Sequence, residues 1–431
     1  MSGSTLLLAA IALCAGVVGL LLFRAGPRLT VVVWAVVLFF VPVWIGVTVG
    51  FFWSAITLLT LAAVLTSISD IRLTAVDLLV AVFALMAVAL FALKMATLSA
   101  TVIALLEWTL PYIWGRLVLA RVTRSFLTRV IATVATVAAV LALIEFATGS
   151  NFFVTLPAMS ADLYANWGGL QIRADRLRAE GAWGHSIALG AALAMSSSFL
   201  IAVRWPVLVR LLALAVVAGA AVVTFSRIGM LTLAFTVVLS ILLLPGLTRA
   251  MRWSVAAMAV IAAALIVPFL GEVFLEAGDE AGGSADYRSS LFSLVSQVQI
   301  FGSAGDWSGL TVGGEYLGAY ARSVDNAFLL FALRFGWVPS LLLIVALVLA
   351  AIGIVRRGEA SPPAVSVAAQ LPALFAVALI TQSGMYLWFL AGLAVAWRQH
   401  GDESPTADQS AGLSRLSISR TKESSVFASL R

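Results

Sequence analysis

The chain of 431 residues is 62% hydrophobic and only 11% charged, whereas a soluble domain carries about 25% charged residues. This composition excludes an ordinary soluble protein and indicates one that lies in a membrane. The net charge of +6 does not predict nucleic-acid binding, because the arginines are scattered without a basic stripe or interleaved aromatic residues. Cys14 is the sole cysteine, which excludes an intrachain disulfide.

Apolar runs of 17 to 21 residues recur along the chain, and each can cross a hydrocarbon core of about 30 Å. The first is read as a membrane helix, because no basic residue precedes it as in a cleaved signal peptide. The second and third could form one broken or re-entrant element around Pro42 and residues 46–50. About thirteen spans are expected, near 5–23, 29–48, 51–68, 77–94, 97–114, 129–147, 185–203, 207–224, 228–245, 253–270, 326–353, 365–382 and 384–397.

Arginine clusters fall in every second connection between these spans. The positive-inside rule assigns their side to the cytoplasm, so the segments at about 148–184 and 271–325 lie outside it, together with the N-terminus. Residues 1–397 are expected to form a single polytopic membrane domain, and the polar tail at 398–431 to be disordered and cytoplasmic. The clustered arginines are Arg24, Arg28, Arg116, Arg121, Arg124, Arg129, Arg204, Arg210, Arg249, Arg252, Arg356 and Arg357.

Both long external segments also carry arginine, which is scarce in short external loops. A fixed guanidinium group suits the binding of phosphate or pyrophosphate. The arginines are Arg173, Arg176 and Arg178 in the first segment and Arg288 and Arg322 in the second. We therefore interpret the chain as a membrane enzyme acting on a pyrophosphate-linked lipid at the outer face.

The first external segment ends in a glycine-rich run at residues 181–190 as the chain re-enters the membrane. Small residues let the backbone approach a ligand or a neighbouring helix closely. In the second segment, Leu291, Leu294, Val295 and Val298 follow helical spacing, opposite serine and glutamine. This pattern predicts an amphipathic helix on the membrane or over a cavity, with Arg288 at its start.

These features resemble those of the O-antigen ligase and O-antigen polymerase (Wzy-type) superfamily of bacterial polysaccharide assembly. Members have an arginine before a glycine-rich run that enters a span, as Arg178 precedes residues 181–190 here. Many also have a Ser-Arg pair in a short outer turn, matched by Ser226 and Arg227. The resemblance extends over about residues 120–397.

The second external segment completes the resemblance. Members have a loop arginine that heads a helix, then a Gly-x-Gly-like segment, matched by Arg288 and residues 302–305. A His-Asn pair and a later glycine follow, where this chain has Asn326 and Gly336. Because Asp325 stands where ligases have histidine, the polymerase interpretation is favoured over the ligase one.

The resemblance implies an all-α, polytopic helix bundle of 12 to 13 spans with GT-C-like architecture in the bacterial cytoplasmic membrane. It implies a metal-independent glycosyltransferase that needs no cofactor and polymerises undecaprenyl-pyrophosphate-linked oligosaccharides for exopolysaccharide or O-antigen. Membrane lipids, a flippase and a chain-length regulator are the expected partners, and nucleic acid is not. The alternatives are ligase-like transfer of the glycan to another acceptor and, with less support, transport of a lipid-linked glycan.

This reaction needs fixed cations at the leaving pyrophosphate and a proton acceptor for the attacking hydroxyl. Arg178 and Arg288 are the leading candidates for the first role, and His185, Asp325 and Glu180 for the second. Further candidates for substrate binding are Arg173, Arg176, Arg227, Arg322, Asn326 and Arg334.

Several candidates also have plainer structural interpretations. Arg178 could form a local salt bridge with Glu180, as Arg288 could with Asp286. Arg173 and Arg176 could be solvated loop charges. Arg227 could reach the outer headgroups along the membrane surface.

The next three alternatives concern helix ends and the bundle interior. His185 could cap the following helix, and Asp325 is a suitable N-cap for the eleventh span. An intramembrane charge such as Arg334 is a candidate functional residue, but it could instead pair with Glu107 or Glu145 to hold the bundle together.

The topology is tested by labelling single cysteines introduced into a Cys14→Ala background. A cysteine at Ser284 should react with a membrane-impermeant reagent in intact cells, because the second long segment is expected outside the cytoplasm. A cysteine at Ser410 should react only after the cells are opened. The reverse pattern would overturn the assignment of the outer face.

Overall fold

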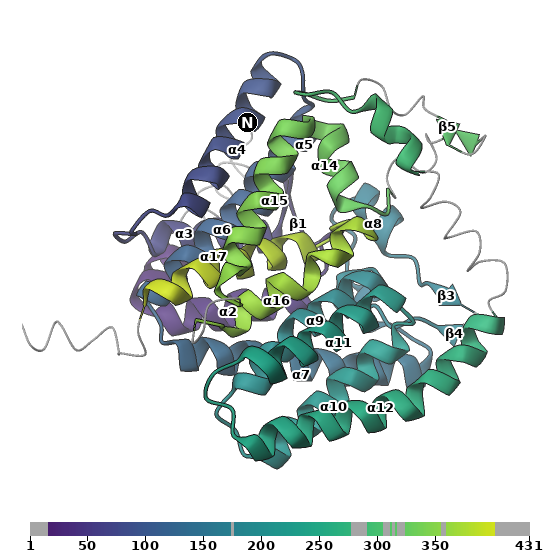
Figure 1. Cartoon of the computed structure of the whole chain (residues 1–431). Helices are drawn as coiled ribbons and strands as arrows, with labels where there is room; N and C mark the ends of the chain where they lie inside the picture. Colours follow the sequence, from purple (N-terminus) through teal and green to yellow (C-terminus); the bar gives the residue numbers. More distant parts are fainter. Residues whose placement is uncertain are drawn as a thin grey trace, which may run out of the picture.

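A computed structural model of the chain describes residues 16–173, 176–276, 291–304, 311–312, 315–316, 324–354 and 359–400. Helices dominate these residues, which confirms the expected all-α class (Figure 1). The strands described form three small antiparallel hairpins. Their members are β1 (Gly46–Val49) with β2 (Phe51–Ser54), β3 (Ile172–Arg173) with β4 (Arg176–Leu177), and β5 (Thr311–Val312) with β6 (Glu315–Tyr316).

The helices follow in chain order, with short 3₁₀ or π segments between some of them. The α-helices are α2 (Pro27–Phe40), α3 (Ala55–Thr66), α4 (Ala75–Ala92), α5 (Leu98–Val102), α6 (Leu110–Leu117), α7 (Arg124–Thr148), α8 (Ala161–Trp167), α9 (Ser186–Ala202), α10 (Val207–Val223), α11 (Arg227–Leu243), α12 (Arg249–Glu276), α14 (Ala327–Phe335), α15 (Trp337–Ala351), α16 (Pro362–Gln370) and α17 (Ser383–Gln399). The remaining segments are the π-helix η1 (Ile103–Thr109) and the 3₁₀ helices η2 (Val118–Ala120), η3 (Phe152–Thr155), η4 (Gly181–Trp183), η5 (Phe292–Gln297), η8 (Ile352–Ile354) and η9 (Pro372–Phe375).

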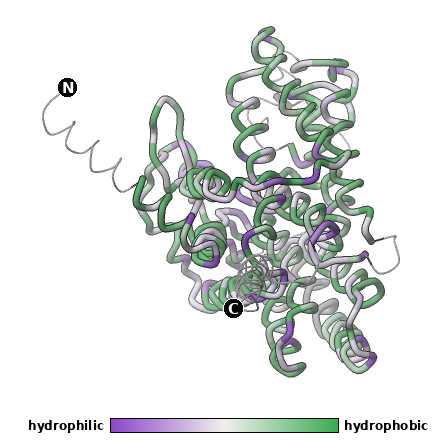
Figure 2. The backbone as a smooth tube through the Cα atoms, turned by 90° about the vertical axis from the view of Figure 1, so that its left-hand side faces the viewer, coloured by the Kyte–Doolittle hydropathy of each residue, from purple (hydrophilic) through white to green (hydrophobic). Residues whose placement is uncertain are grey.

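Three helical segments of the described residues are long and apolar enough to cross a membrane: Ala75–Ala92, Leu98–Ala120 and Arg124–Thr148. The pair Gly16–Ala25 and Pro27–Phe40, bent by 118°, would be a fourth if it forms one span. Shorter apolar helices occupy most of the other expected positions. The helices are mainly hydrophobic along their length (Figure 2), as a membrane protein requires.

Two expected spans differ in the structure. The chain is not helical through residues 29–48, because α2 ends at Phe40 and β1 begins at Gly46, which confirms the alternative of a break around Pro42. Pro42 lies in this break, and proline cannot donate a backbone hydrogen bond to continue a helix. The expected span at 51–68 is shortened to α3, since β2 pairs with β1 as far as Ser54.

The prediction that the eleventh span is one helix over residues 326–353 is wrong. The chain turns at Gly336, whose φ is 88°, and divides into α14 and α15, which lie beside each other (Figure 1). A Cβ atom at Gly336 would lie 2.7 Å from the carbonyl oxygen of Ile300. Glycine is therefore needed both for the backbone conformation and for the contact with residues 299–301.

The helices define two ends of the bundle. At one, Arg124 donates to the carbonyl oxygen of Trp397, and Arg121 donates to that of Arg24 at 2.6 Å. We call it the basic end. At the other end, Gln382 donates to the carbonyl oxygen of Val41 at 2.7 Å. We call it the loop end, because residues 149–185 lie there. By the positive-inside rule, we infer that the basic end is cytoplasmic.

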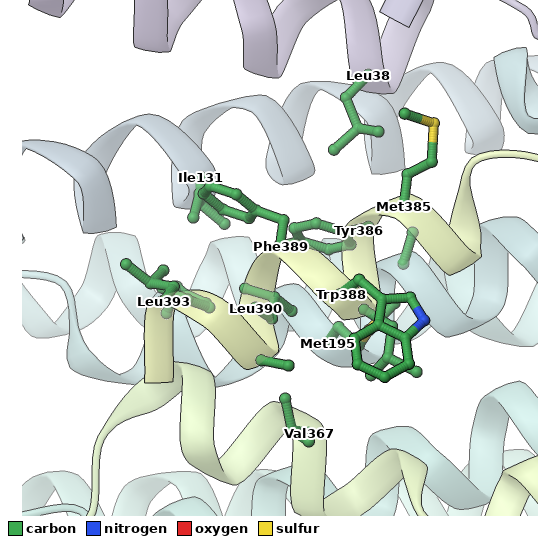
Figure 3. Packing of buried hydrophobic residues seen from close by; sticks show 14 of the residues in the cluster. Leu38, Ile131, Met195, Val367, Met385, Tyr386, Trp388, Phe389, Leu390 and Leu393 are labelled. Atoms are coloured by element: carbon green, nitrogen blue, oxygen red, sulfur yellow. The ribbon is translucent and has the colours of Figure 1, made fainter. Parts of the chain in front are cut away.

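The centre of the bundle is formed by α17, whose residues from Ser383 to Ala396 are all buried. A helix that is apolar on every side is expected in such a position. Figure 3 shows Tyr386, Phe389 and Leu390 of this helix among side chains from neighbouring helices. The closest approach is to α6, since a Cβ atom at Gly392 would lie 2.1 Å from the carbonyl oxygen of Tyr112.

A buried ion pair joins α4 to α6 at the basic end. Asp77 completes a capping box with Thr74 at the start of α4. Its carboxylate also accepts a hydrogen bond from the Arg116 Nε atom at 2.7 Å and one from the Tyr112 hydroxyl at 2.8 Å. These shared hydrogen bonds compensate for the removal of both charges from water.

The contact between α6 and α17 predicts a large difference between two glycine substitutions. Gly392→Ala should destabilise the protein by about 3 kcal/mol, because the added methyl group meets fixed backbone. Gly219→Ala in α10 is the matched control, since its nearest contact would be 3.7 Å away, and it should stabilise by about 0.5–1 kcal/mol. Thermal unfolding of the purified proteins in detergent measures the difference, and equal effects would contradict the packing described.

Candidate functional site

The loop between α7 and α9 is tied to the last turn of α7 by one carboxylate. Glu145 Oε1 accepts from the backbone N–H of Glu180 at 3.0 Å, and Oε2 accepts from that of Gly181 at 2.9 Å. The Asn151 side chain donates to Glu145 at 3.0 Å and to the Gly181 carbonyl oxygen at 3.0 Å. The two ends of the loop are therefore fixed against the same residue.

The side chain of Glu180 is fully buried beneath this loop. Its Oε1 atom accepts from the Gln171 N–H at 2.7 Å, whereas its buried Oε2 atom has no hydrogen-bond partner. Burial raises the pKa of Glu180 to about 8, and the negative charge of Glu145 adds to the shift while Arg178 opposes it. The protonated form of Glu180 therefore predominates at neutral pH.

Arg178 is fixed across the turn between α10 and α11. Its Nε atom donates to the carbonyl oxygen of Thr224 at 3.0 Å, and its backbone N–H donates to that of Gln171 at 2.9 Å. The next residue, Ala179, donates to Val223 at 3.0 Å. These contacts hold the guanidinium group where α10 ends and α11 begins.

The turn that receives Arg178 contains the predicted Ser-Arg pair. Ser226 is the N-cap of α11 and accepts from the Gly229 N–H at 3.1 Å. Arg227 is the first residue of α11 and is exposed. The structure thus places Arg178 and Arg227 at the same turn. Arg178 contacts the turn at Thr224, and Arg227 follows Ser226 in the chain.

His185 is the N-cap of α9, which confirms the plainer of its two interpretations. Its Nδ1 atom accepts from the Ile187 N–H at 3.1 Å, and its ring meets the Trp167 ring edge-on at 5.9 Å. Burial, and then the charge of Arg178, lower the pKa of His185 to about 3. The neutral ring carries its proton on Nε2, so it is suited to donate a hydrogen bond and not to accept a proton.

The glycine-rich run serves helix packing as well as the loop. A Cβ atom on Gly190 would lie 3.3 Å from the Cα atom of Gly229, so α9 and α11 approach closely there. At Gly184, φ is 62° and a Cβ atom would lie 2.7 Å from the carbonyl oxygen of Trp167. At both glycines, the absence of a side chain lets the backbone of another segment of the protein approach closely.

The second predicted part of the site begins at α14. Asn326 is its N-cap, with Oδ1 accepting from the Leu329 N–H at 2.9 Å. The expectation that Asp325 caps this helix is therefore wrong by one residue. Asn326 directly precedes the first helical residue, so its side-chain oxygen reaches the free N–H groups. Asp325 lies one residue earlier and is partly buried.

One segment connects the two parts of the site. Val377 accepts a hydrogen bond from the Ala327 N–H at 3.0 Å, and Ala378 packs in the cluster that contains Val324 and Leu329. Val377 and Ala378 also line a small pocket together with Ile187 and Ala188 of α9. The start of α9 and the start of α14 therefore flank the same short stretch of chain at the loop end.

Arg334 lies in α14, in the last turn. Its electrostatic partner is Glu107 of the π-helix η1, which decides between the two carboxylates considered, because Glu145 is occupied by the loop. Trp108 beside Glu107 packs on Phe331 with 4.5 Å between ring centroids. The pair of Arg334 and Glu107 is therefore part of the packing contact between α14 and the π-helix η1.

Several predicted residues cannot be placed. Arg288 and Arg322 lie outside the described residues, as does the side chain of Arg173, whereas Arg176 is partly buried in β4. The expected amphipathic helix is described only from Leu291 onward, mainly as the 3₁₀ helix η5. Leu291 and Leu294 are buried as predicted, but Val295 is exposed because a 3₁₀ helix repeats every three residues.

An apolar groove reaches this site from the side of the bundle. It has a volume of about 420 Å³ and runs between α2 and the outer part of α7. Phe40, Val137, Leu141 and Ile144 line it, and Glu145 and Asn151 lie at its polar end together with Phe152 and Phe153. An apolar chain lying in the groove would therefore lead to the carboxylate that holds the loop.

The sequence analysis did not name Asn151 and Gln171 of the site, and it named Glu145 only as a possible partner of Arg334 and not as the loop anchor. The one available signal was the position of Glu145 at the end of an apolar helix, where a charge requires a partner. Within the described residues, no group of three or more His, Cys, Asp or Glu side chains could hold a metal ion. Comparison with protein-family models, curated proteins and solved structures finds no match for the chain.

The protonated state of Glu180 predicts a pH dependence of stability. The native carboxyl keeps its proton up to about pH 8, whereas the unfolded one releases it near 4.5, so stability falls as pH rises through this range. His185 acts in the opposite sense, but only between about 3 and 6.5. His185 therefore makes no contribution to the pH dependence between pH 6.5 and 8.

Glu180→Gln should flatten the decrease in unfolding temperature between pH 6.5 and 8, because the amide is neutral throughout. The measurement is the difference between variant and wild type across the pH series, in which the contributions of unrelated groups cancel. An unchanged slope in the variant would show that Glu180 is ionised in the native protein.

Proposed function

We propose that the protein is a membrane glycosyltransferase that polymerises undecaprenyl-pyrophosphate-linked oligosaccharide repeat units at the outer face of the bacterial cytoplasmic membrane. The observation that carries the proposal is the position of Arg178, whose guanidinium group is fixed to the α10–α11 turn at 3.0 Å. A fixed cation at the loop end suits a pyrophosphate group that is held at the membrane surface.

The apolar groove supports the same substrate class. The prenyl tail of such a donor has to remain in an apolar environment while its pyrophosphate reaches the loop end. The groove between α2 and α7 provides this environment up to Glu145, whose hydrogen bonds position the segment that precedes His185.

In the proposed reaction, the hydroxyl oxygen of one repeat unit attacks the anomeric carbon of the donor glycan. The bond from that carbon to the pyrophosphate oxygen breaks, and undecaprenyl pyrophosphate leaves with the electron pair. Arg178, with Arg288 and Arg227, stabilises the charge that develops on the leaving group. The Nε2–H group of His185 donates a hydrogen bond to a substrate oxygen.

The hydroxyl proton requires an acceptor. Glu180 is protonated at neutral pH because of its raised pKa, and the Nδ1 atom of His185 is occupied by the Ile187 N–H. Asp325 is the remaining candidate of the three. Its place beside the α14 N-cap, near the segment that also contacts α9, supports this assignment.

Ligase-like transfer to a different acceptor uses the same donor and the same residues, so it remains the alternative. Transport of a lipid-linked glycan has less support, because an internal repeat and charges near the bilayer midplane would be expected. Purified lipid-linked repeat unit should be converted to longer chains by the purified protein if it is a polymerase, and a transporter would leave it unchanged.

Lysine substitutions test the arginine assignment. Arg178→Lys and Arg288→Lys should each lower the polymerisation rate about 100-fold or more, because lysine keeps the charge but lacks the planar guanidinium fork. Arg249→Lys, an exposed arginine at the basic end, is the matched control and should retain the wild-type rate.

Expression and membrane insertion are measured alongside activity, and all three variants should match the wild type. Wild-type rates in both Arg178→Lys and Arg288→Lys would contradict the proposed site. An equal loss in Arg249→Lys would show that the effect is not specific to the loop end.

A further inference from the structure

A second cavity lies at the basic end of the bundle, far from the loop end. Its volume is about 470 Å³. Its walls come from the start of α7, the α9–α10 and α11–α12 connections, the start of α16 and the end of α17. These segments are distant in sequence, and together they place three arginines, Arg124, Arg204 and Arg210, around one space.

The charge of this cavity has one sign. Among the described residues, fourteen line the cavity, and they include these three arginines and neither Asp nor Glu. Glu359 precedes the lining residue Ala360 but is itself exposed. A concave site with three guanidinium groups is chemically suited to an anion with several oxygen atoms, such as a phosphate group.

The arginines are held in place by the protein. Arg210 donates to the carbonyl oxygen of Ile201 at 3.1 Å, near the end of α9, while its buried Nε atom has no hydrogen-bond partner. Arg124 donates to the carbonyl oxygen of Trp397 and stacks over its ring at 5.3 Å. These contacts fix two of the three guanidinium groups beside the cavity.

The other side chains that line the cavity indicate which kind of anion fits it. Ala202, Val203, Leu244, Leu247 and Trp397 give the cavity an apolar part beside its arginines, and the neighbouring Leu208 is 68% exposed on the outer surface of α10. A ligand that matches both parts has a phosphate group joined to an apolar chain. A free phosphate ion would leave the apolar wall unused.

We propose that this cavity binds the headgroup of an anionic phospholipid from the cytoplasmic leaflet, with its phosphate among Arg124, Arg204 and Arg210. The basic end is the cytoplasmic end by the positive-inside rule. Anionic lipids of that leaflet are attracted to basic pockets between membrane helices. The bound lipid would contact the ends of α7, α9, α10, α16 and α17. This proposal does not depend on the function proposed for the loop end.

Lipid binding is measured by native mass spectrometry of the purified full chain with phosphatidylglycerol or phosphatidylcholine added at matched concentrations. Phosphatidylglycerol should bind the wild type more tightly than phosphatidylcholine. Arg204→Gln should weaken phosphatidylglycerol binding about fivefold, and Arg204→Gln with Arg210→Gln about thirtyfold. Arg129→Gln, an exposed arginine on α7 outside the cavity, is the matched control and should change the affinity less than twofold.

Arg204 is exposed, so its single variant keeps the test independent of any folding defect in the double variant. A third arm adds glycerol phosphate as a soluble competitor, which should displace the lipid only at far higher concentration. Equal binding by the wild type and Arg204→Gln, or by the two lipids, would overturn the proposal. Equal affinity for glycerol phosphate and phosphatidylglycerol would overturn the lipid assignment in favour of a soluble phosphate.

Discussion

The loop end depends on a single carboxylate at the end of α7. Glu180 and Gly181 are buried away from water, so the protein itself has to provide partners for their backbone N–H groups. Glu145 does this with both oxygen atoms, which accept the N–H groups of Glu180 and Gly181. Because Arg178 and His185 stand on either side of these two residues, the contact also positions both of them in the loop between α7 and α9.

The same loop shows how burial changes the roles of ionisable groups. Glu180 and His185 are the residues with the most obvious acid–base chemistry in the loop, yet burial drives both to their neutral forms, with the pKa of Glu180 raised and that of His185 lowered. Arg178 retains its charge and is fixed by backbone contacts. The described part of the site is therefore better suited to stabilise negative charge than to transfer protons.

The sequence predicted the helical class and the membrane character of the chain, because hydropathy reports directly on membrane insertion. It anticipated the break around Pro42 but not the division at Gly336, since that division depends on the contact of Gly336 with the distant residue Ile300. It also misplaced the cap of α14 by one residue. The anchoring role of Glu145 could not be read from sequence, because its partners lie 35 and 36 residues away.

The two ends of the bundle are connected by the same helices. Helix α7 carries Arg124 at the cavity and Glu145 at the loop, and its 25 residues span about 37 Å. Helix α9 likewise runs from the His185 cap to Ile201, which accepts from Arg210. Switching between such distant sites requires an element with two discrete arrangements, whereas rigid, closely packed helices have a single arrangement. A lipid bound at the basic end would thus stabilise the existing positions of Glu145 and His185, and would raise the stability of the site without switching it.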